Sequence, residues 1–165
     1  MGGVPRWTVV TLAVMALLLA AAWMWMRGGG AGMSARAVTI PIEGADLRRG
    51  AALYAANCAS CHGADLEGAA DWRAQLPDGT FPPPPHDETG HTWHHGDATL
   101  FAYTKLGGQA LMGSSGKSGM PGFGEMLSDE DIRAILAYIK SDWPTRAREA
   151  QAERTRAENA RLSGG

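Results

Sequence analysis

The sequence predicts a mostly α-helical protein, with one small folded domain between an N-terminal apolar segment and a charged C-terminal helix. Three observations predict this class. Residues 7–26 contain no charged side chain, and their polar residues are limited to two threonines. Residues 46–57, 97–106 and 128–142 have helix-forming compositions and are separated by stretches rich in glycine and proline. A chain of 165 residues has room for one domain and an appendage, but not for a second enzymatic domain.

These features divide the chain into four parts. We expect an N-terminal anchor at residues 1–27, a tether at 28–41, a folded domain at 42–143 and a charged helical extension at 144–165. The tether begins with the run GGGAG, a composition typical of flexible linkers. The formal net charge is −2, and no cluster of Lys and Arg is interleaved with aromatic residues. Binding to nucleic acid is therefore not expected.

The apolar segment at residues 7–26 is long enough to cross a membrane. At about 1.5 Å per residue, its length as a helix matches the roughly 30 Å hydrocarbon core of a bilayer. Trp7 at one end, and Trp23 and Trp25 at the other, stand where interfacial aromatic residues are common. A cleaved signal peptide, with alanines at 20–22 near its cleavage site, is the alternative. Because the apolar run continues beyond a usual signal core, we expect a retained single-pass anchor.

The first elements of the domain follow from capping and punctuation. Residues 46–57 begin at an N-cap, Asp46, and form a helix that runs into a pair of cysteines. Residues 63–96 carry many prolines and glycines and are expected to form a long structured loop. Residues 97–106 then form a short helix with an N-cap and a glycine stop, and 109–125 form a Gly- and Ser-rich loop.

The last helix of the domain has the strongest signals. Ser128 is its N-cap, the acidic first turn favours the helix dipole, and the helix extends to residue 142. Its apolar stripe consists of Ile132, Ile135, Leu136 and Ile139. Pro144 ends it, and residues 145–162 are again helical in composition. Because the apolar positions of this extension are mostly alanine, we expect a solvated helix, with docking on a partner as the alternative.

The candidate functional centre is the motif Cys58-Ala-Ser-Cys61-His62, which contains the chain's two cysteines. Two thiols at this spacing can form a disulfide, half of a zinc site, a redox pair or a haem attachment site. A zinc site needs four ligands, and no second cysteine pair exists, although nearby histidines could complete one. A thioredoxin-like motif should follow a strand, whereas the flanks here are helical.

Covalent haem attachment accounts for all three residues of the motif. A plain disulfide leaves His62 without a role, whereas a c-type haem uses both thiols on its vinyl groups and the histidine as an axial iron ligand. Two residues between Cys58 and Cys61 match the separation of the vinyl groups, and the next residue then lies beneath the iron. This attachment is made on the exported side of a membrane, which indicates that the N-terminus is inside and the domain outside.

With these residues, the chain resembles the membrane-anchored class I c-type cytochromes of bacteria over residues 42–143. In that family a glycine and an aromatic residue precede the first cysteine by eight and four positions, and Gly50 and Tyr54 fit. They cross the last helix at an aliphatic and an aromatic residue three apart, as Ile135 and Tyr138 are. The resemblance implies the class I cytochrome c fold around one covalently bound haem c, with Tyr54 beside it.

The resemblance also implies a distal methionine ligand in the loop before the last helix. Met120 is followed by proline, glycine and phenylalanine, as in the family, whereas Met112 and Met126 are not followed by proline. A methionine ligand stabilises ferrous iron and raises the reduction potential. Because both axial positions are then filled by His62 and Met120, no open site remains for a substrate. We therefore expect an electron carrier and not an enzyme, although it could serve as a subunit of an oxidoreductase.

The chain departs from the family in a longer stretch at residues 81–97. In the family a proline carbonyl accepts the Nδ1 hydrogen of the proximal histidine, and one of the prolines at 82–85 could do so here. Trp93 is expected to donate a hydrogen bond to a haem propionate. Four histidines in this stretch are interpreted as propionate contacts, turn caps or partner surface, with a second metal site as the minority hypothesis: His86, His91, His94 and His95.

These inferences predict a membrane-tethered, single-haem carrier on the periplasmic side of a bacterial inner membrane. We expect a cytochrome bc complex or a dehydrogenase as its electron donor and a terminal oxidase or reductase as its acceptor. Two alternatives remain. The chain could be a fixed haem subunit of a membrane enzyme, docked through residues 145–162. It could also be a metal-handling or sensor protein that uses the histidines at 86–95.

Overall fold

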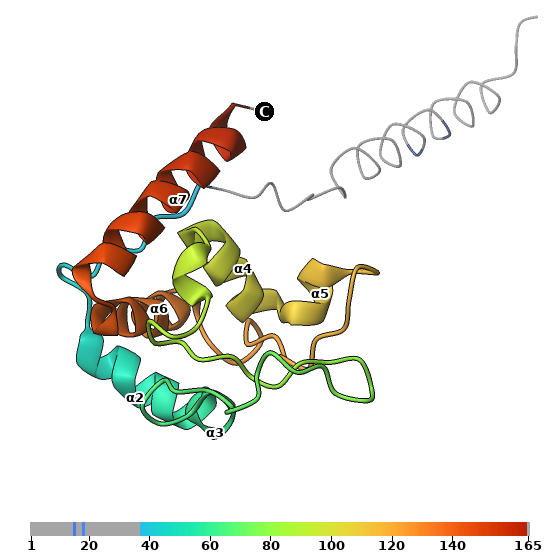
Figure 1. Ribbon diagram of the computed structural model, residues 1–165. Helices are drawn as coiled ribbons and strands as arrows, with labels where there is room; N and C mark the ends of the chain where they lie inside the picture. Colours follow the sequence, from blue (N-terminus) through green and yellow to red (C-terminus); the bar gives the residue numbers. More distant parts are fainter. Residues whose placement is uncertain (1–14, 16–17, 19–36, 165) are drawn as a thin grey trace, which may run out of the picture. The chain divides into compact units, whose positions relative to one another are not determined.

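The computed structural model describes Met15, Leu18 and residues 37–164. The chain divides into two compact units, residues 1–34 and 35–165. Within the described part of the second unit, six α-helices and one 3₁₀ helix pack together, and the described residues contain no strand (Figure 1). The mostly helical fold class is thereby confirmed. Apart from Met15 and Leu18, the predicted anchor and the first part of the tether lie outside the described residues. Among the residues that the structure does describe, no helix is long and apolar enough to cross a membrane.

The core of the domain is built on the crossing of α2 (Leu47–Asn57) and α6 (Asp129–Asp142). Both helices begin at the predicted N-caps. Asp46 accepts a hydrogen bond from the backbone N–H of Arg49, and Ser128 forms a capping box with Asp131. At the crossing, a Cβ on Gly50 would lie 2.2 Å from the carbonyl oxygen of Ala134. Only glycine permits so close a contact between the two backbones.

The predicted apolar stripe of α6 is the centre of the hydrophobic core. Its four members are almost completely buried: Ile132, Ile135, Leu136 and Ile139. They pack with Tyr54 from α2, with Trp143 at the end of α6, and with the segment at Val38 and Ile40 that precedes α2. A tryptophan and a tyrosine fully removed from water account for a large share of the apolar surface that this core buries.

The predicted loop at 109–125 is in part helical, which corrects the sequence-based expectation. After α4 (Asp97–Leu106), the chain turns at Gly107 and immediately forms the five-residue helix α5 (Gly108–Met112). The backbone φ of Gly107 is +84°, a conformation that glycine adopts without a steric penalty. Such a short helix carries too few residues to show an apolar period, so composition alone suggested a loop.

The C-terminal helix α7 (Thr145–Ser163) has the predicted extent, but it is docked on the domain and is not a solvated helix. Its buried face consists of Ala147, Gln151 and Thr155. The amide of Gln151 donates to the carboxylate of Asp97 at 2.8 Å, and the backbone N–H of Asp97 donates to the hydroxyl of Thr155 at 3.1 Å. The expectation failed because it counted apolar side chains, whereas α7 docks through polar ones.

A carboxylate of α7 also caps the beginning of α4. The N-cap position of α4 is Gly96, which has no side chain to offer. Glu158 instead accepts hydrogen bonds from the backbone N–H groups of Ala98 at 3.0 Å and Thr99 at 3.1 Å. These are groups that a helix leaves without intrahelical partners, and a negative charge is favoured at that end of the helix dipole.

Candidate functional site

Both cysteines of the motif are free thiols at the junction of α2 and the short helix α3 (Ala59–His62). Cys58 ends α2 and is half-buried against the core, whereas Cys61 is exposed. The pKa of the Cys58 thiol is raised to about 11, mainly by burial and to a smaller extent by the neighbouring Cys61. The disulfide that this spacing would allow is not formed, so both sulfur atoms are available for another bond.

His62 is buried, with 8% of its surface exposed, and its Nδ1 atom is held by one hydrogen bond. Its Nδ1 atom lies 2.9 Å from the carbonyl oxygen of Pro84. Because a carbonyl can only accept, Nδ1 must carry the hydrogen, and the lone pair is on Nε2. Burial lowers the pKa of His62, and the hydrogen bond to Pro84 opposes this shift in part. The neutral ring with a free Nε2 is the form that binds a metal.

The carbonyl of Pro84 reaches His62 because two loop segments lie against each other. The backbone N–H of His86 donates to the carbonyl of Leu66 at 2.7 Å. A Cβ on Gly68 would lie 2.5 Å from the carbonyl carbon of Pro84, so only glycine allows the segments to approach this closely. Leu66, which is buried, has a φ of 67° in the left-handed region that side chains usually avoid.

Tyr54 connects the core to the end of the cysteine motif. Its hydroxyl donates to the carbonyl oxygen of Gly63, the residue after His62, at 2.9 Å. Its ring is buried and lies 5.6 Å from that of Tyr138 on α6. Burial is the main cause of a raised pKa, so the hydroxyl stays protonated and remains a donor. The structure therefore places Tyr54 as a residue that positions the motif.

Met120 lies in the loop after α5 and packs, partly buried, against the same hydrophobic core as Cys58. Both its backbone N–H and its backbone carbonyl form hydrogen bonds. The N–H donates to the hydroxyl of Ser118 at 3.2 Å, and the carbonyl accepts from the N–H of Gly108 at 3.1 Å. A Cβ on Gly107 would lie 3.0 Å from the Met120 carbonyl, so α4 and α5 hold this loop closely.

His86 makes the least expected contact of the site, since its ring is stacked on that of His62. The ring centroids are 4.0 Å apart and the planes differ by 22°. The Nδ1 atom of His86 lies 2.9 Å from the hydroxyl of Thr92, and its backbone carbonyl accepts from the indole of Trp143 at 2.7 Å. Burial lowers the pKa of His86 to about 3, with the nearby His62 as the next cause.

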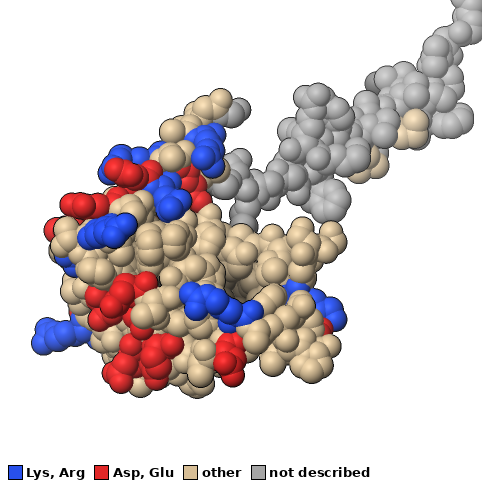
Figure 2. Space-filling view, viewed as in Figure 1, with Lys and Arg blue, Asp and Glu red and all other residues tan. Residues whose placement is uncertain are grey.

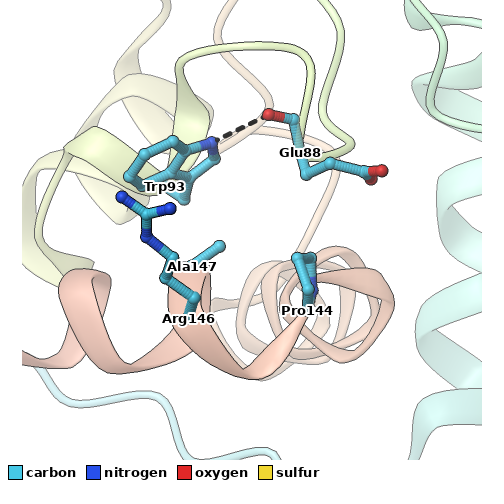
Figure 3. A pocket seen from close by; sticks show the side chains of 5 residues that line it. All are labelled: Glu88, Trp93, Pro144, Arg146 and Ala147. Atoms are coloured by element: carbon cyan, nitrogen blue, oxygen red, sulfur yellow. Dashed lines mark hydrogen bonds between the residues drawn. The ribbon is translucent and has the colours of Figure 1, made fainter.

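The indole of Trp93, for which we predicted a bond to a haem propionate, donates instead to the carbonyl oxygen of Glu88 at 3.2 Å. Figure 3 shows this bond at a pocket that Pro144, Arg146 and Ala147 line from the α7 side. Trp93 lies in the short 3₁₀ helix η1 (Thr92–His94), and its indole contacts the loop that precedes this helix. A role for Trp93 toward the haem stays a prediction, with its N–H already engaged within the protein.

The other histidines of the loop are engaged in stacking. His91 stacks on Trp72 with ring centroids 5.3 Å apart, and His94 stacks on Trp93 at 3.7 Å. His95 lies edge-on to His91. Within the part of the chain that the structure describes, no group of three or more His, Cys, Asp or Glu side chains could hold a metal ion. The hypothesis of a second metal site therefore has no support from these residues.

The residues at Cys58, Cys61 and His62 fit a covalently attached haem. Two free thiols precede a buried imidazole whose Nδ1 is engaged and whose Nε2 can act as a ligand. The proline predicted to orient His62 is identified as Pro84. The roles of His86, Thr92 and Trp143 were missed, because no local pattern reports that the loop at 86–92 and the end of α6 meet beside His62.

Comparisons with known proteins agree with this geometry. The model of the family "cytochrome c" matches residues 47–143. The chain is also similar to the protein "cytochrome c6" of Picosynechococcus sp. (strain ATCC 27264 / PCC 7002 / PR-6), with 34% identity over 107 residues, or 60% of this chain and 75% of the relative. No solved structure matches the chain. The family match contains α2 to α6 and stops before α7.

Proposed function

Because this chain belongs to the cytochrome c family and carries one covalently bound haem c, we propose that it is a membrane-tethered carrier of single electrons on the periplasmic face of a bacterial inner membrane. Its class, a monohaem electron carrier, follows from the family. The tether, the compartment and the partners are the proposal. We propose a cytochrome bc complex or a dehydrogenase as donor, and a terminal oxidase or reductase as acceptor.

The hydrogen bond between His62 and Pro84 is the observation that carries the site assignment. It gives the neutral imidazole an Nε2 lone pair directly after two free thiols. We propose that Cys58 and Cys61 form the thioether bonds and that His62 is the proximal ligand. An acceptor at Nδ1 also raises the basicity of a ligating histidine, which is how such a second partner adjusts a metal centre.

We propose Met120 as the distal ligand. Its support is the loop held by α4 and α5, its partial burial against the core, and the Met-Pro-Gly-Phe sequence. When bound, the haem supplies an iron that takes up and releases one electron. His62 and Met120 would hold the iron, which would leave no position for an exogenous ligand and would confine the chemistry to electron transfer.

A paired substitution tests this assignment. The full-length holoprotein with Met120→Ala is expected to keep its covalent haem, lose the near-infrared Met-to-iron band and have a lower reduction potential. Met126→Ala is the matched control, because the side chain of Met126 is 68% exposed and lies in the same loop region. An unchanged band in Met120→Ala would reject the ligand assignment. A denatured sample without covalent haem would reject the whole site.

The tether is supported by the apolar segment at 7–26 and the Gly-rich run at 28–32. A tethered carrier meets membrane partners at a raised effective concentration, and brief electron-transfer encounters use small interfaces. Figure 2 shows acidic and basic side chains mixed on one face of the domain, with the surface over α5 largely uncharged. The full chain should sediment with membranes, resist extraction by salt and be released by detergent; recovery in the soluble periplasmic fraction would reject tethering.

Neither alternative function gains support from the domain. The permanent-subunit hypothesis relied on α7 as a docking arm, but its face at Gln151 and Thr155 is occupied by the domain itself. The metal-handling hypothesis relied on the loop at 86–95, whose rings are stacked on His62, Trp72 and Trp93. A single electron carrier therefore explains the described residues with the fewest additional requirements.

A further inference from the structure

The strongest unexplained contact of the molecule is the stack of His86 on His62. The two imidazole planes are nearly parallel, at 22°, with ring centroids 4.0 Å apart. Aromatic pairs usually have their ring centroids about 4.5–7 Å apart, so these two rings are stacked more closely than usual. This inference rests on the proposed function, in which His62 is the proximal iron ligand. The question is what a second, non-ligating imidazole does beside that ligand.

The hydrogen bond to Pro84 alone does not fix the plane of the His62 ring. Carbonyl oxygens accept hydrogen bonds over a broad range of directions, and the torsion about the ring bond of histidine is soft. One acceptor at 2.9 Å therefore keeps Nδ1 near one position but permits the ring to rock about it. A flat neighbour on the face of the ring opposes this motion, because rocking either compresses the stack or opens it.

His86 is held well enough to serve as such a neighbour. Its backbone N–H donates to Leu66 at 2.7 Å, and its carbonyl accepts from the Trp143 indole at 2.7 Å. Its ring is fixed by Thr92, whose hydroxyl lies 2.9 Å from Nδ1 and donates to the carbonyl of Pro85 at 3.3 Å. Since that hydroxyl hydrogen is used on Pro85, Nδ1 of His86 donates to the Thr92 oxygen.

The edge of a further aromatic ring limits His86 from another direction. The ring of Tyr54 lies edge-on to it, with centroids 6.3 Å apart and planes at 73°. The imidazole of His86 is thus restrained by a backbone bond on each side, by a buried threonine and by a buried tyrosine. A side chain with this many restraints transmits its orientation to whatever is stacked upon it.

We propose that His86 is a positioning residue that sets the plane of the proximal His62 ring by face-to-face stacking, and thereby the electronic symmetry of the ferric haem. The plane of an axial imidazole contributes to the energy splitting of the two iron dπ orbitals, which extend above and below the haem plane. That splitting is read in the g values of the electron paramagnetic resonance spectrum and in the spread of the haem methyl signals in the proton magnetic resonance spectrum.

Two substitutions at the same position separate the flat face from simple space filling. In the oxidised full-length holoprotein, His86→Leu is expected to broaden and shift the largest g feature and to change the spread of the haem methyl signals. His86→Phe, which restores a flat ring, is expected to return both signals toward the wild type. Ser128→Ala is the control for a general loss of stability, since it removes the N-cap of α6 and touches neither ring of the stack, and it is expected to keep the wild-type g values and methyl signals.

Unchanged g values and methyl signals in His86→Leu would overturn the inference, and so would equal shifts in His86→Leu and His86→Phe. If His86→Leu does not accumulate with haem, Thr92→Val keeps the His86 ring and removes its Nδ1 partner. We then expect a smaller shift in the same signals, and a wild-type spectrum of Thr92→Val would overturn the inference. A wild-type protein without a low-spin signal and a Met-to-iron band would instead reject the proposed ligand set.

Discussion

A buried ion pair joins four segments of the domain, and its removal gives a stringent test of the fold. The ammonium group of Lys140 on α6 lies 2.8 and 3.0 Å from the two carboxylate oxygens of Asp97 on α4, and 2.6 Å from the carbonyl oxygen of Ile40. The side chains of Lys140 and Asp97 are 8% and 2% exposed. Asp97 also accepts from the N–H of Ile40 at 2.7 Å and from Gln151 on α7 at 2.8 Å.

The expected loss in the free energy of unfolding depends on which buried groups each substitution leaves without a partner. Lys140→Met leaves the carboxylate of Asp97 buried with two neutral donors and no opposite charge, which costs about 3–5 kcal/mol in buried pairs. Asp97→Ala should cost more. It leaves the ammonium of Lys140 with one carbonyl, and it also strips the N–H of Ile40 of its acceptor, at about 1–3 kcal/mol for that unsatisfied group. Gln151 loses one acceptor and keeps the carbonyl of His95 and the hydroxyl of Thr155.

The assay is denaturant unfolding of the oxidised holoprotein, followed by far-ultraviolet circular dichroism. We expect the wild type to be the most stable, Lys140→Met to be less stable, and Asp97→Ala to be the least stable. Lys105→Met is the control, because its ion pair with Asp129 is largely exposed, with side-chain exposures of 34% and 57%, and such pairs contribute about 0–1 kcal/mol. A loss of less than about 1 kcal/mol in Lys140→Met would refute the argument that this charge pair is desolvated.

Three further predictions concern the packing of the helices. Gly50→Ala should destabilise the holoprotein in the same unfolding assay, since its Cβ would lie 2.2 Å from the backbone of α6, whereas Gly119→Ala, with open space around it, should not. Glu158→Ala should cost about 1–2 kcal/mol by uncapping α4, and Glu158→Gln, which keeps an acceptor, should cost less; equal losses would argue against capping. Hydrogen bonds from Ser128, and next from the guanidinium of Arg49 on α2, lower the pKa of Asp131 below its usual 3.8. The ionised carboxylate therefore stabilises the fold above pH 3.8, and this contribution is lost as the pH falls through the folded-state pKa. Acid unfolding of Asp131→Asn should therefore depend less on pH below about 4, and an unchanged acid profile would contradict this.

Much of the domain could be predicted because its signals are local. The N-caps at Asp46 and Ser128 and the apolar stripe of α6 each depend on residues within a few positions of one another. The cysteine motif is equally local, since Cys58, Cys61 and His62 span five residues. Gly50 was identified through the family pattern, and the structure shows why glycine is needed there.

The features that could not be predicted depend on contacts between distant polar groups. Which of four consecutive prolines would accept from His62 depends on how Gly68 and Leu66 turn the preceding loop, and no sequence rule reports that. The docking of α7 was missed for a related reason. A helix with alanine, glutamine and threonine on its inner face shows no apolar moment, yet its hydrogen bonds to Asp97 hold it in place.

Helix α7, which lies beyond the family match, packs against the loop at residues 81–97. The match to the family ends at residue 143, and α7 follows it; the loop at 81–97 contains η1. α7 packs on η1, and Gln151 donates to the carbonyl of His95 in the same loop. The loop and α7 thus cover part of each other's surface.

This pairing has a consequence at the haem-binding motif. The loop that α7 covers is the loop that carries His86 to the face of His62 and the carbonyl of Pro84 to its Nδ1. Trp143, the residue immediately before the Pro144 that opens α7, donates to the backbone of His86. The C-terminal extension therefore braces the loop that contacts His62, and within that loop His86 is the histidine whose ring stacks on His62.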